Sequence, residues 1–126
     1  MNINKFTIKS QEALQQAQQI AQSFGQQQLE NEHIFKGILE VDENVTPFIL
    51  KKLNVNVELF KKVLDSTIQS FPKVSGGDIM FSREAGTTVN EAEIIAKKMN
   101  DEFVSIEHLI LAIFKSKSKV AQILKD

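Results

Sequence analysis

The chain of 126 residues contains no cysteine, tryptophan or tyrosine. Without thiols it can form neither a disulfide nor a thiolate metal site, which is compatible with a cytoplasmic setting. Only two prolines and five glycines interrupt the sequence, and this scarcity favours long helices over a β fold with many turns. No apolar run approaches the roughly 20 residues that a membrane-spanning helix needs. The N-terminal residues also lack the apolar segment of a signal peptide and the arginines of a presequence.

The chain also has no large excess of positive or negative charge, since its net charge is −1. Lysine and arginine alternate with aspartate and glutamate along the chain, so no basic stripe indicates binding to nucleic acid or to an acidic membrane. With 42% hydrophobic and 25% charged residues, the composition is that of one ordinary globular domain.

The motifs of common catalytic sites are missing as well. The sequence has no GxSxG nucleophile elbow, no GxxxxGK[ST] phosphate loop and no HExxH zinc motif. Gly76-Gly77 lacks both the preceding strand and the lysine of a phosphate loop, so we interpret it as part of a linker. We therefore expect no enzyme activity, no metal site and no cofactor in this chain.

What the sequence does contain is helical periodicity. We expect a first helix that is capped by Thr7 and stopped by Gly25, and a second that begins near Asn31. Thr46-Pro47 predicts the cap and first residue of a third helix, and Asn56 predicts the cap of a fourth. Their apolar stripes are Ala13, Leu14, Ala17, Ile20, Ala21 and Phe24; Ile34, Phe35, Ile38 and Leu39; Phe48, Ile49 and Leu53; and Phe60, Val63, Leu64 and Ile68.

The pattern then repeats after a shift of 75 residues. Cap, stripe and loop lengths agree without a gap, and the positions with identical partners are Phe6, Ala17, Ile20, Ala21, Glu32, His33, Ile38 and Val45. The sequence therefore predicts an all-α fold, a tandem pseudo-twofold repeat of a four-helix unit. We expect one domain over 1–126, with repeat one at 1–71, a connector at 72–80 and repeat two at 81–126. The partner of the fourth helix is missing from repeat two, as in a fragment of a longer protein.

Two sets of polar residues are candidates for a site. Glu32-His33 and Glu107-His108 each open a helix, where a carboxylate is favoured by the helix dipole. We interpret the pairs as capping and packing residues, with acid–base or metal chemistry as the less favoured alternative. The hydroxyls of Thr7 and Ser82 are related by the repeat and are expected to cap helices. Spacing within each repeat would set Thr7 with Glu32 and Ser82 with Glu107, two sets that could grip a cationic group of a partner.

An apolar surface is the second candidate feature. Ile94 stands where repeat one has Gln19, and the end of the connector adds Ile79 and Met80. Apolar side chains beside a polar rim are typical of a peptide-binding groove. The alternative is that they pack against the other repeat.

Four segments, FTIKSQEALQQAQQIA, ENEHIFKGILE, FPKVSGGD and EFVSIEHLILAIF, occur in this order within the tandem repeat. They resemble the N-terminal repeat domain of the Clp AAA+ unfoldases over essentially the whole chain. The connector and the glutamine-rich first helix are more similar to the ClpB branch, the disaggregating chaperones of the stress response, than to ClpA or ClpC. The resemblance implies a monomeric, mobile domain tethered to a homohexameric ATPase ring. It implies unfolded or aggregated polypeptides, and adaptor proteins, as partners, while ATP and Mg belong to the ATPase domains of the longer protein.

The resemblance also implies residue roles. Thr7, Asp101 and Glu107 match the client-contact positions of the family, and Val89 and Ile95 are expected to line the groove. A ClpC-like alternative reads phosphoarginine tags or adaptors with Glu32 and Glu107 and the nearby hydroxyls. Ser82 departs from the threonine of that pattern, and His108 stands where some ClpB relatives carry leucine.

Overall fold

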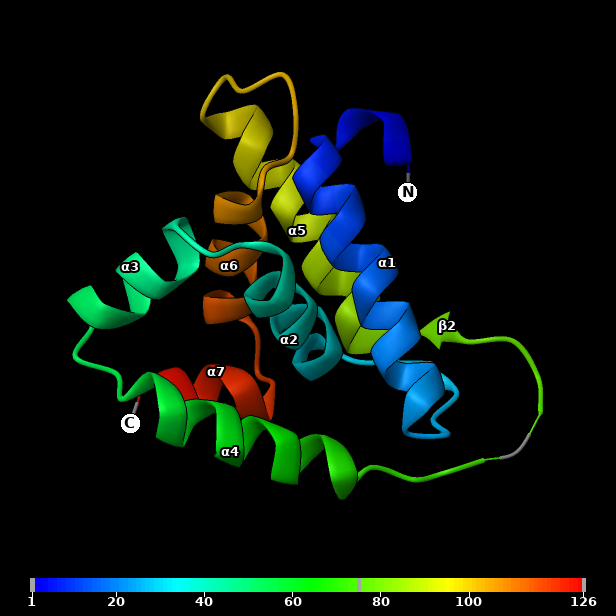
Figure 1. Ribbon diagram of the computed structural model, residues 1–126. Coiled ribbons are helices and arrows are strands. Elements are labelled where there is room, and N and C mark those ends of the chain that lie inside the picture. Colours follow the sequence, from blue (N-terminus) through cyan, green and yellow to red (C-terminus); the bar gives the residue numbers. More distant parts are fainter. Residues whose placement is uncertain (1, 75, 126) are drawn as a thin grey trace.

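The computed structural model describes residues 2–74 and 76–125, and over these residues the protein is a bundle of seven α-helices (Figure 1). The expected all-α fold is confirmed. Besides the helices there are one 3-10 turn and two strands of two residues each. In chain order the elements are η1 (Ile3–Lys5), α1 (Ile8–Ser23), β1 (Gln28–Leu29), α2 (Asn31–Val41), α3 (Val45–Lys52), α4 (Val57–Gln69), β2 (Met80–Phe81), α5 (Arg83–Lys98), α6 (Ile106–Lys115) and α7 (Lys119–Lys125).

The two long helices that open the repeats begin and end in the same way. The Thr7 hydroxyl accepts a hydrogen bond from the Ser10 amide at 3.1 Å, and the Ser82 hydroxyl accepts one from the Ala85 amide at 3.1 Å. Both predicted caps are thus confirmed. Beyond the C-terminal ends, Gly25 adopts φ +70° and its repeat counterpart Asn100 adopts φ +58°, the left-handed conformation that ends many helices.

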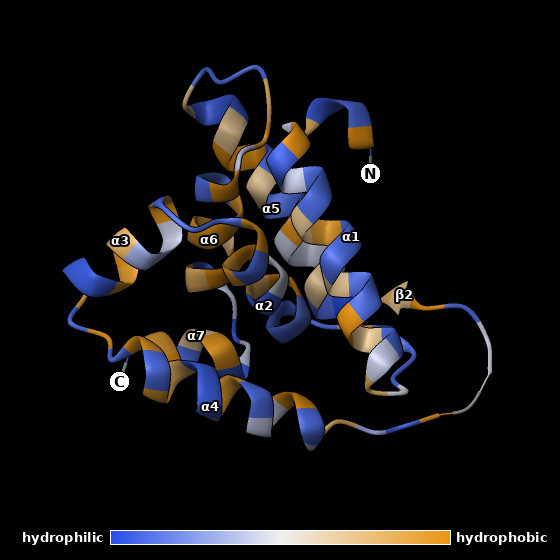
Figure 2. Ribbon diagram, viewed as in Figure 1, coloured by the Kyte–Doolittle hydropathy of each residue, from blue (hydrophilic) through white to orange (hydrophobic). Residues whose placement is uncertain are grey.

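The helices α5, α6 and α7 repeat α1, α2 and α3, and no element among the described residues repeats α4. The core forms around the two central helices α2 and α6, where Ile34, Phe35, Ile38, Leu109 and Ile113 are fully buried. Helix α4 packs on α2 and lies beside α7 (Figure 1). Apolar and polar residues alternate along each helix (Figure 2), as expected of amphipathic helices that each bury one face.

The backbones of α1 and α2 come into direct contact at one glycine. A Cβ atom added to Gly37 would lie 2.5 Å from the Ala13 carbonyl oxygen and 3.0 Å from the Ala17 nitrogen. The counterpart of Gly37 on α6 is Ala112, so the second hairpin has no equally close approach built into its sequence.

One predicted helix start is wrong. Helix α3 begins at Val45, not after Thr46, with Asn44 as its N-cap residue, because the carboxylate of Asp42 binds the backbone amides at this end. Asp42 accepts hydrogen bonds from the amides of Asn44, Val45 and Thr46 and from the Thr46 hydroxyl, at 2.7–3.2 Å. Burial alone would raise the pKa of Asp42, but these hydrogen bonds outweigh it and hold the pKa below its usual range.

Candidate functional site

Two short backbone pairings cross from one repeat to the other. Strands β1 and β2 run parallel, with Gln28 opposite Met80 and Leu29 opposite Phe81. The second pairing is a parallel bridge between Phe6 and Val104, in which the Thr7 amide donates to the Val104 carbonyl oxygen at 2.9 Å. A shift of 75 residues turns this bond into the bond from the Ser82 amide to the Leu29 carbonyl oxygen, at 3.0 Å. The crossed pairing is therefore itself repeated.

This crossing corrects the expected pairing of hydroxyls with carboxylates. Thr7 lies against Val104 in the loop that leads into α6 and Glu107, whereas Ser82 lies against strand β1, which leads into α2 and Glu32. Each of the two residues is thus bonded through its amide to the segment that precedes the glutamate of the other repeat. The physical reason is that each strand satisfies its backbone groups on the other copy, which spacing along one copy does not reveal.

We call the first of these places the Thr7 end, made of Thr7, Ile8, Phe103 and Glu107, all within three residues of the Phe6–Val104 bridge. Ile8 is 76% exposed and Phe103 is 46% exposed, although both are large apolar residues. Glu107 is exposed as well and lies in the first turn of α6. The Thr7 end therefore combines apolar surface with a carboxylate.

The repeat counterparts of these residues form the Ser82 end, made of Ser82, Arg83, Gln28 and Glu32. Here arginine replaces the exposed isoleucine, and glutamine replaces the exposed phenylalanine. Ser82 and Glu32 are buried. The two ends share a backbone frame but differ in surface. At the Thr7 end these positions hold two exposed apolar side chains, whereas at the Ser82 end they are polar and the exposed apolar side chain nearby is Met80, opposite Gln28 and 71% exposed.

Glu32 was expected to cap its own helix, α2. Its carboxylate instead caps α7, a helix of the other repeat. Its carboxylate accepts a hydrogen bond from the Val120 amide at 2.8 Å, in the first turn of α7. Burial raises the pKa of Glu32, and the neighbouring charges of Glu30 and Glu84 add to this, while the bond from Val120 opposes it. The carboxylate is thus already engaged within the protein and is only 3% exposed.

Both histidines cap their helix by a hydrogen bond to the residue that precedes it, which confirms for the histidines the capping role expected of the Glu-His pairs. In repeat one the Glu30 amide donates to Nδ1 of His33 at 2.9 Å, and Nε2 of His33 lies 2.6 Å from Oε1 of Gln26. In repeat two the Ser105 amide donates to Nδ1 of His108 at 2.8 Å. The sequence indicates this role by the position of each histidine. It is the third residue of its helix, where capping boxes usually place Glu or Gln.

Asp101 is the counterpart of Gln26 in repeat two. Its Oδ2 atom lies 2.8 Å from Nε2 of His108, and 48% of its side chain is exposed. The carboxylate predicted to contact clients is therefore held by a buried histidine of the protein.

Val89 and Ile95 were expected to line the groove, and Val89 lines a cavity of about 180 Å³ together with Phe81 and Asn90. Val89 and Ile95 are 3% and 7% exposed and belong to the hydrophobic core, because they lie on the face of α5 that packs inward. The exposed apolar residue of this helix is Ile94, at 40%. Ile94 and Asp101 help to line a cavity of about 390 Å³ that reaches Lys5 and Val104, next to the Thr7 end.

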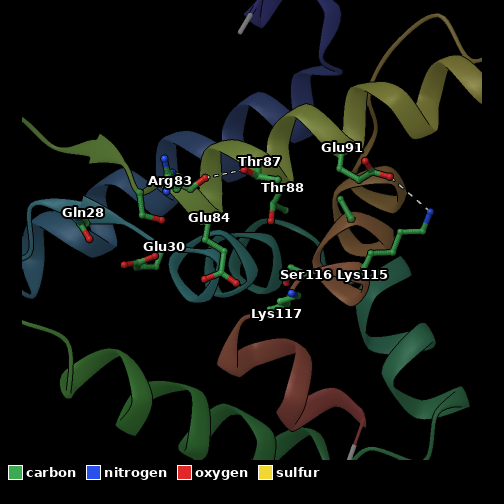
Figure 3. A pocket seen from close by; sticks show the side chains of 12 residues that line it. Gln28, Glu30, Arg83, Glu84, Thr87, Thr88, Glu91, Lys115, Ser116 and Lys117 are labelled. Carbon is green, nitrogen blue, oxygen red and sulfur yellow. Dashed lines mark hydrogen bonds and ion pairs between the residues drawn. The ribbon is translucent and has the colours of Figure 1, made fainter.

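A larger cavity of about 900 Å³ lies at the Ser82 end, between α5 and the region where α6 ends (Figure 3). Its lining carries charges of both signs, and Glu91 faces Lys115 across it at 3.7 Å. The charged and polar lining residues are Gln28, Glu30, Ser82, Arg83, Glu84, Thr87, Thr88, Glu91, Lys115, Ser116 and Lys117.

Within residues 2–74 and 76–125, no three His, Asp or Glu side chains converge as metal ligands would. Over the same residues, no helix combines the length and the apolar character needed to cross a bilayer.

The chain is similar to known proteins of one family. The model of the Clp repeat (R) N-terminal domain matches residues 5–126. Chaperone protein ClpB of Bacteroides thetaiotaomicron is 51% identical over 126 residues, which are 100% of this chain and 15% of the relative. Chaperone protein ClpB of Porphyromonas gingivalis is 40% identical over the same shares. The chain thus spans about 15% of the length of these curated relatives.

Solved structures show the same fold at low sequence identity. The Hsp104 N-terminal domain from Candida albicans superposes with a TM-score of 0.87 at 19% identity, covering 96% of this chain and 80% of that one. The N-terminal domain of the ClpV1 ATPase from Escherichia coli gives a TM-score of 0.85 at 14% identity, with 97% and 77% covered.

Proposed function

We propose, from the premise that this chain belongs to the Clp repeat (R) N-terminal domain family, that it is the client-engaging domain of a ClpB-type disaggregating chaperone. It binds unfolded or aggregated polypeptide in the cytoplasm, so that a homohexameric ATPase ring of the same longer protein can thread the client. ATP and Mg act in that ring, because this chain carries no phosphate-loop motif. The domain itself performs no chemistry.

The observation that carries the proposal is the difference between the two ends. Ile8 and Phe103 are exposed at the Thr7 end, and their counterparts Arg83 and Gln28 are polar. An unfolded client differs from a folded protein chiefly by its exposed apolar side chains, and burying one fully is worth about 1.5–3 kcal/mol. The Thr7 end offers Ile8 and Phe103 together to such side chains, whereas at the Ser82 end the counterpart positions are polar and Met80 is the exposed apolar residue nearby.

The carboxylate of Glu107 gives the Thr7 end a charge preference. It lies exposed in the first turn of α6, where it can approach a lysine or arginine that flanks an apolar client segment. An exposed ion pair contributes about 0–1 kcal/mol and weakens with salt. We therefore expect Glu107 to bias the choice of client, while the apolar contacts supply most of the affinity.

Binding by one domain should be weak. Ordering a flexible client costs free energy that offsets most of the apolar gain. Several domains tethered to one ring raise the effective concentration of the second and later contacts. Weak individual contacts also let the client leave the domain for the ring.

The proposal can be tested by titrating the labelled domain with a permanently unfolded protein, reduced and carboxymethylated α-lactalbumin. Amide NMR shifts should concentrate around Thr7, Ile8, Phe103 and Glu107. The substitutions Ile8→Ser and Phe103→Ser should each weaken binding about fivefold, equivalent to about 1 kcal/mol. Glu107→Gln should weaken binding less, and its effect should shrink at high salt.

Matched controls come from the other end. Arg83→Ser and Gln28→Ser change the counterpart positions on the same backbone frame, and they should leave the affinity unchanged. Shifts spread evenly over both ends, or equal losses from the two sets of variants, would exclude the Thr7 end as the client site.

The phosphoarginine alternative needs both repeat-related glutamates at the surface. The Glu32 carboxylate is buried and bonded to the Val120 amide, so nothing in the described residues favours a two-site reader. Titration with free phosphoarginine separates the two functions, because tight binding at two sites would support the alternative and overturn the proposal above.

A further inference from the structure

We infer that Asp101 is a positioning residue, which acts through His108 to hold the first turn of α6 and with it Glu107. This inference rests on the proposed function, because it assigns a role within the same site. It differs from a direct client contact, since the acceptor atom of Asp101 is needed and its negative charge is not.

The hydrogen bonds of His108 fix the tautomer of its imidazole. The Ser105 amide donates to Nδ1 of His108 at 2.8 Å, so Nδ1 carries no proton. The ring is neutral in this arrangement and holds its proton on Nε2. Oδ2 of Asp101, 2.8 Å away, accepts that proton's hydrogen bond. The acceptor at Nε2 therefore selects the tautomer that can receive the Ser105 amide.

The imidazole of His108 links the end of α5 to the start of α6. Asp101 follows α5 and is anchored there, because its amide donates to the Ala96 carbonyl oxygen at 2.9 Å. Ser105 immediately precedes α6, and Glu107 is the second residue of that helix. His108 thus ties the end of α5 to the start of α6 across the loop of residues 101–105.

The same loop carries the contact with the N-terminal segment. Val104 donates to the Lys5 carbonyl oxygen at 2.7 Å and accepts from the Thr7 amide at 2.9 Å. A loop held at both ends keeps Thr7, Phe103 and Glu107 in one arrangement. If the hold at Asp101 is lost, these residues move independently, and the client meets a less ordered surface.

Repeat one contains the counterpart of this arrangement, with Gln26 in the place of Asp101 and His33 in the place of His108. Gln26 is anchored to the Ala21 carbonyl oxygen at 2.9 Å, as Asp101 is to that of Ala96. Its Oε1 atom lies 2.6 Å from Nε2 of His33, whose Nδ1 accepts from the Glu30 amide at 2.9 Å. An uncharged amide oxygen thus supports the same histidine in the same geometry. The protein itself shows that the acceptor suffices without a charge.

The experiment compares Asp101→Asn, which keeps an acceptor and removes the charge, with Asp101→Ala, which removes both. The tautomer of His108 is read from the ¹⁵N shifts of its ring, and client affinity is measured with carboxymethylated α-lactalbumin. We expect Asp101→Asn to keep the Nε2–H tautomer and an affinity within about twofold. Asp101→Ala should give a mixture of tautomers, faster exchange of the Ser105 amide and a loss of about fivefold or more.

A double-mutant cycle shows whether Asp101 acts through α6. Glu107→Gln should have its full effect on affinity in the Asp101→Asn background and a reduced effect in the Asp101→Ala background. Gln26→Ala is the matched control, because it frees the counterpart histidine at the other end and should leave client affinity unchanged. Circular dichroism at the binding temperature confirms that each variant is folded.

The inference is overturned if Asp101→Asn loses as much affinity as Asp101→Ala while keeping the Nε2–H tautomer, since the charge would then contact the client. It is also overturned if Asp101→Ala leaves the tautomer unchanged. If the unaltered domain binds no client, the proposed function fails, but the tautomer and the exchange of the Ser105 amide still decide whether Asp101 holds α6.

Discussion

Acid should destabilise the protein through His33, well above the pH at which carboxylates usually protonate. The side chain is fully buried, and burial lowers the pKa of His33 from 6.5 to about 4. Between these two values the unfolded chain binds a proton at this residue and the folded chain does not. The unfolded state therefore gains stability as the pH falls through this window.

The size of the effect follows from the two pKa values. One pH unit within the window corresponds to about 1.4 kcal/mol. The free energy of unfolding should thus lose about 2 kcal/mol through His33 between pH 6.5 and pH 5. Burial raises the pKa of Glu32, so its protonation in the folded state acts in the opposite direction. The observed pH dependence of the unaltered protein will for this reason be smaller than the contribution of His33.

Urea denaturation from pH 7.5 to pH 4.5, with His33→Gln as the reference, isolates the contribution. Glutamine at this position can still accept from the Glu30 amide, as in an ordinary capping box, and it does not titrate. The stability difference between the two proteins should shift by about 2 kcal/mol toward the variant as the pH falls from 6.5 to 5. A difference that stays constant over this range would refute the reasoning, because His33 would then not be buried in its neutral form.

Two further predictions concern stability and use the same urea assay. Gly37→Ala should cost about 1–3 kcal/mol, because the new methyl group would collide with the Ala13 carbonyl oxygen; Ala112→Gly at the counterpart position should cost only about 1 kcal/mol, and equal costs would contradict the close approach. Asn31→Leu should raise stability by about 1 kcal/mol, because the Asn31 amide is 1% exposed and neither its nitrogen nor its oxygen finds a hydrogen-bond partner in the protein. The counterpart of Asn31 is the buried Ile106, and a loss of stability in Asn31→Leu would contradict the prediction.

The helices could be predicted from the sequence because the signals that produce them are local. A hydroxyl or amide cap acts on a backbone group three residues away, as at Thr7, Asn56 and Ser82. An apolar stripe likewise reports the buried face of a single helix. The predicted stripe of α3 was wrong, because Phe48 and Leu53 are 61% and 47% exposed while Thr46 and Leu50 are the buried residues of this helix. In α7 Val120 is buried, although its counterpart Val45 in α3 is 39% exposed.

The arrangement at the site could not be predicted, because it depends on contacts between distant segments. The bridge between Phe6 and Val104 pairs one residue with one residue. Such a short pairing leaves no periodic pattern of apolar residues from which it could be predicted. The shift of 75 residues relates the copies to each other, but it does not say whether Thr7 faces its own copy or the other. The stripe of repeat one, shifted by 75 residues, places Val89 and Ile95 on the buried face of α5, where the structure has them; their assignment to the groove comes from the family resemblance.

The two glutamates show how a difference outside the site decides what the site contains. Glu32 and Glu107 occupy the same place in the two repeats, and the Val120 amide that Glu32 binds has the Val45 amide as its counterpart. The Val45 amide is already bonded to Asp42, and the counterpart of Asp42 is Lys117. A lysine offers no acceptor to a helix N-terminus, so α7 takes Glu32 from the other repeat. Helix α3 makes no such demand on Glu107, whose carboxylate stays exposed in the first turn of α6, as the proposed client site requires.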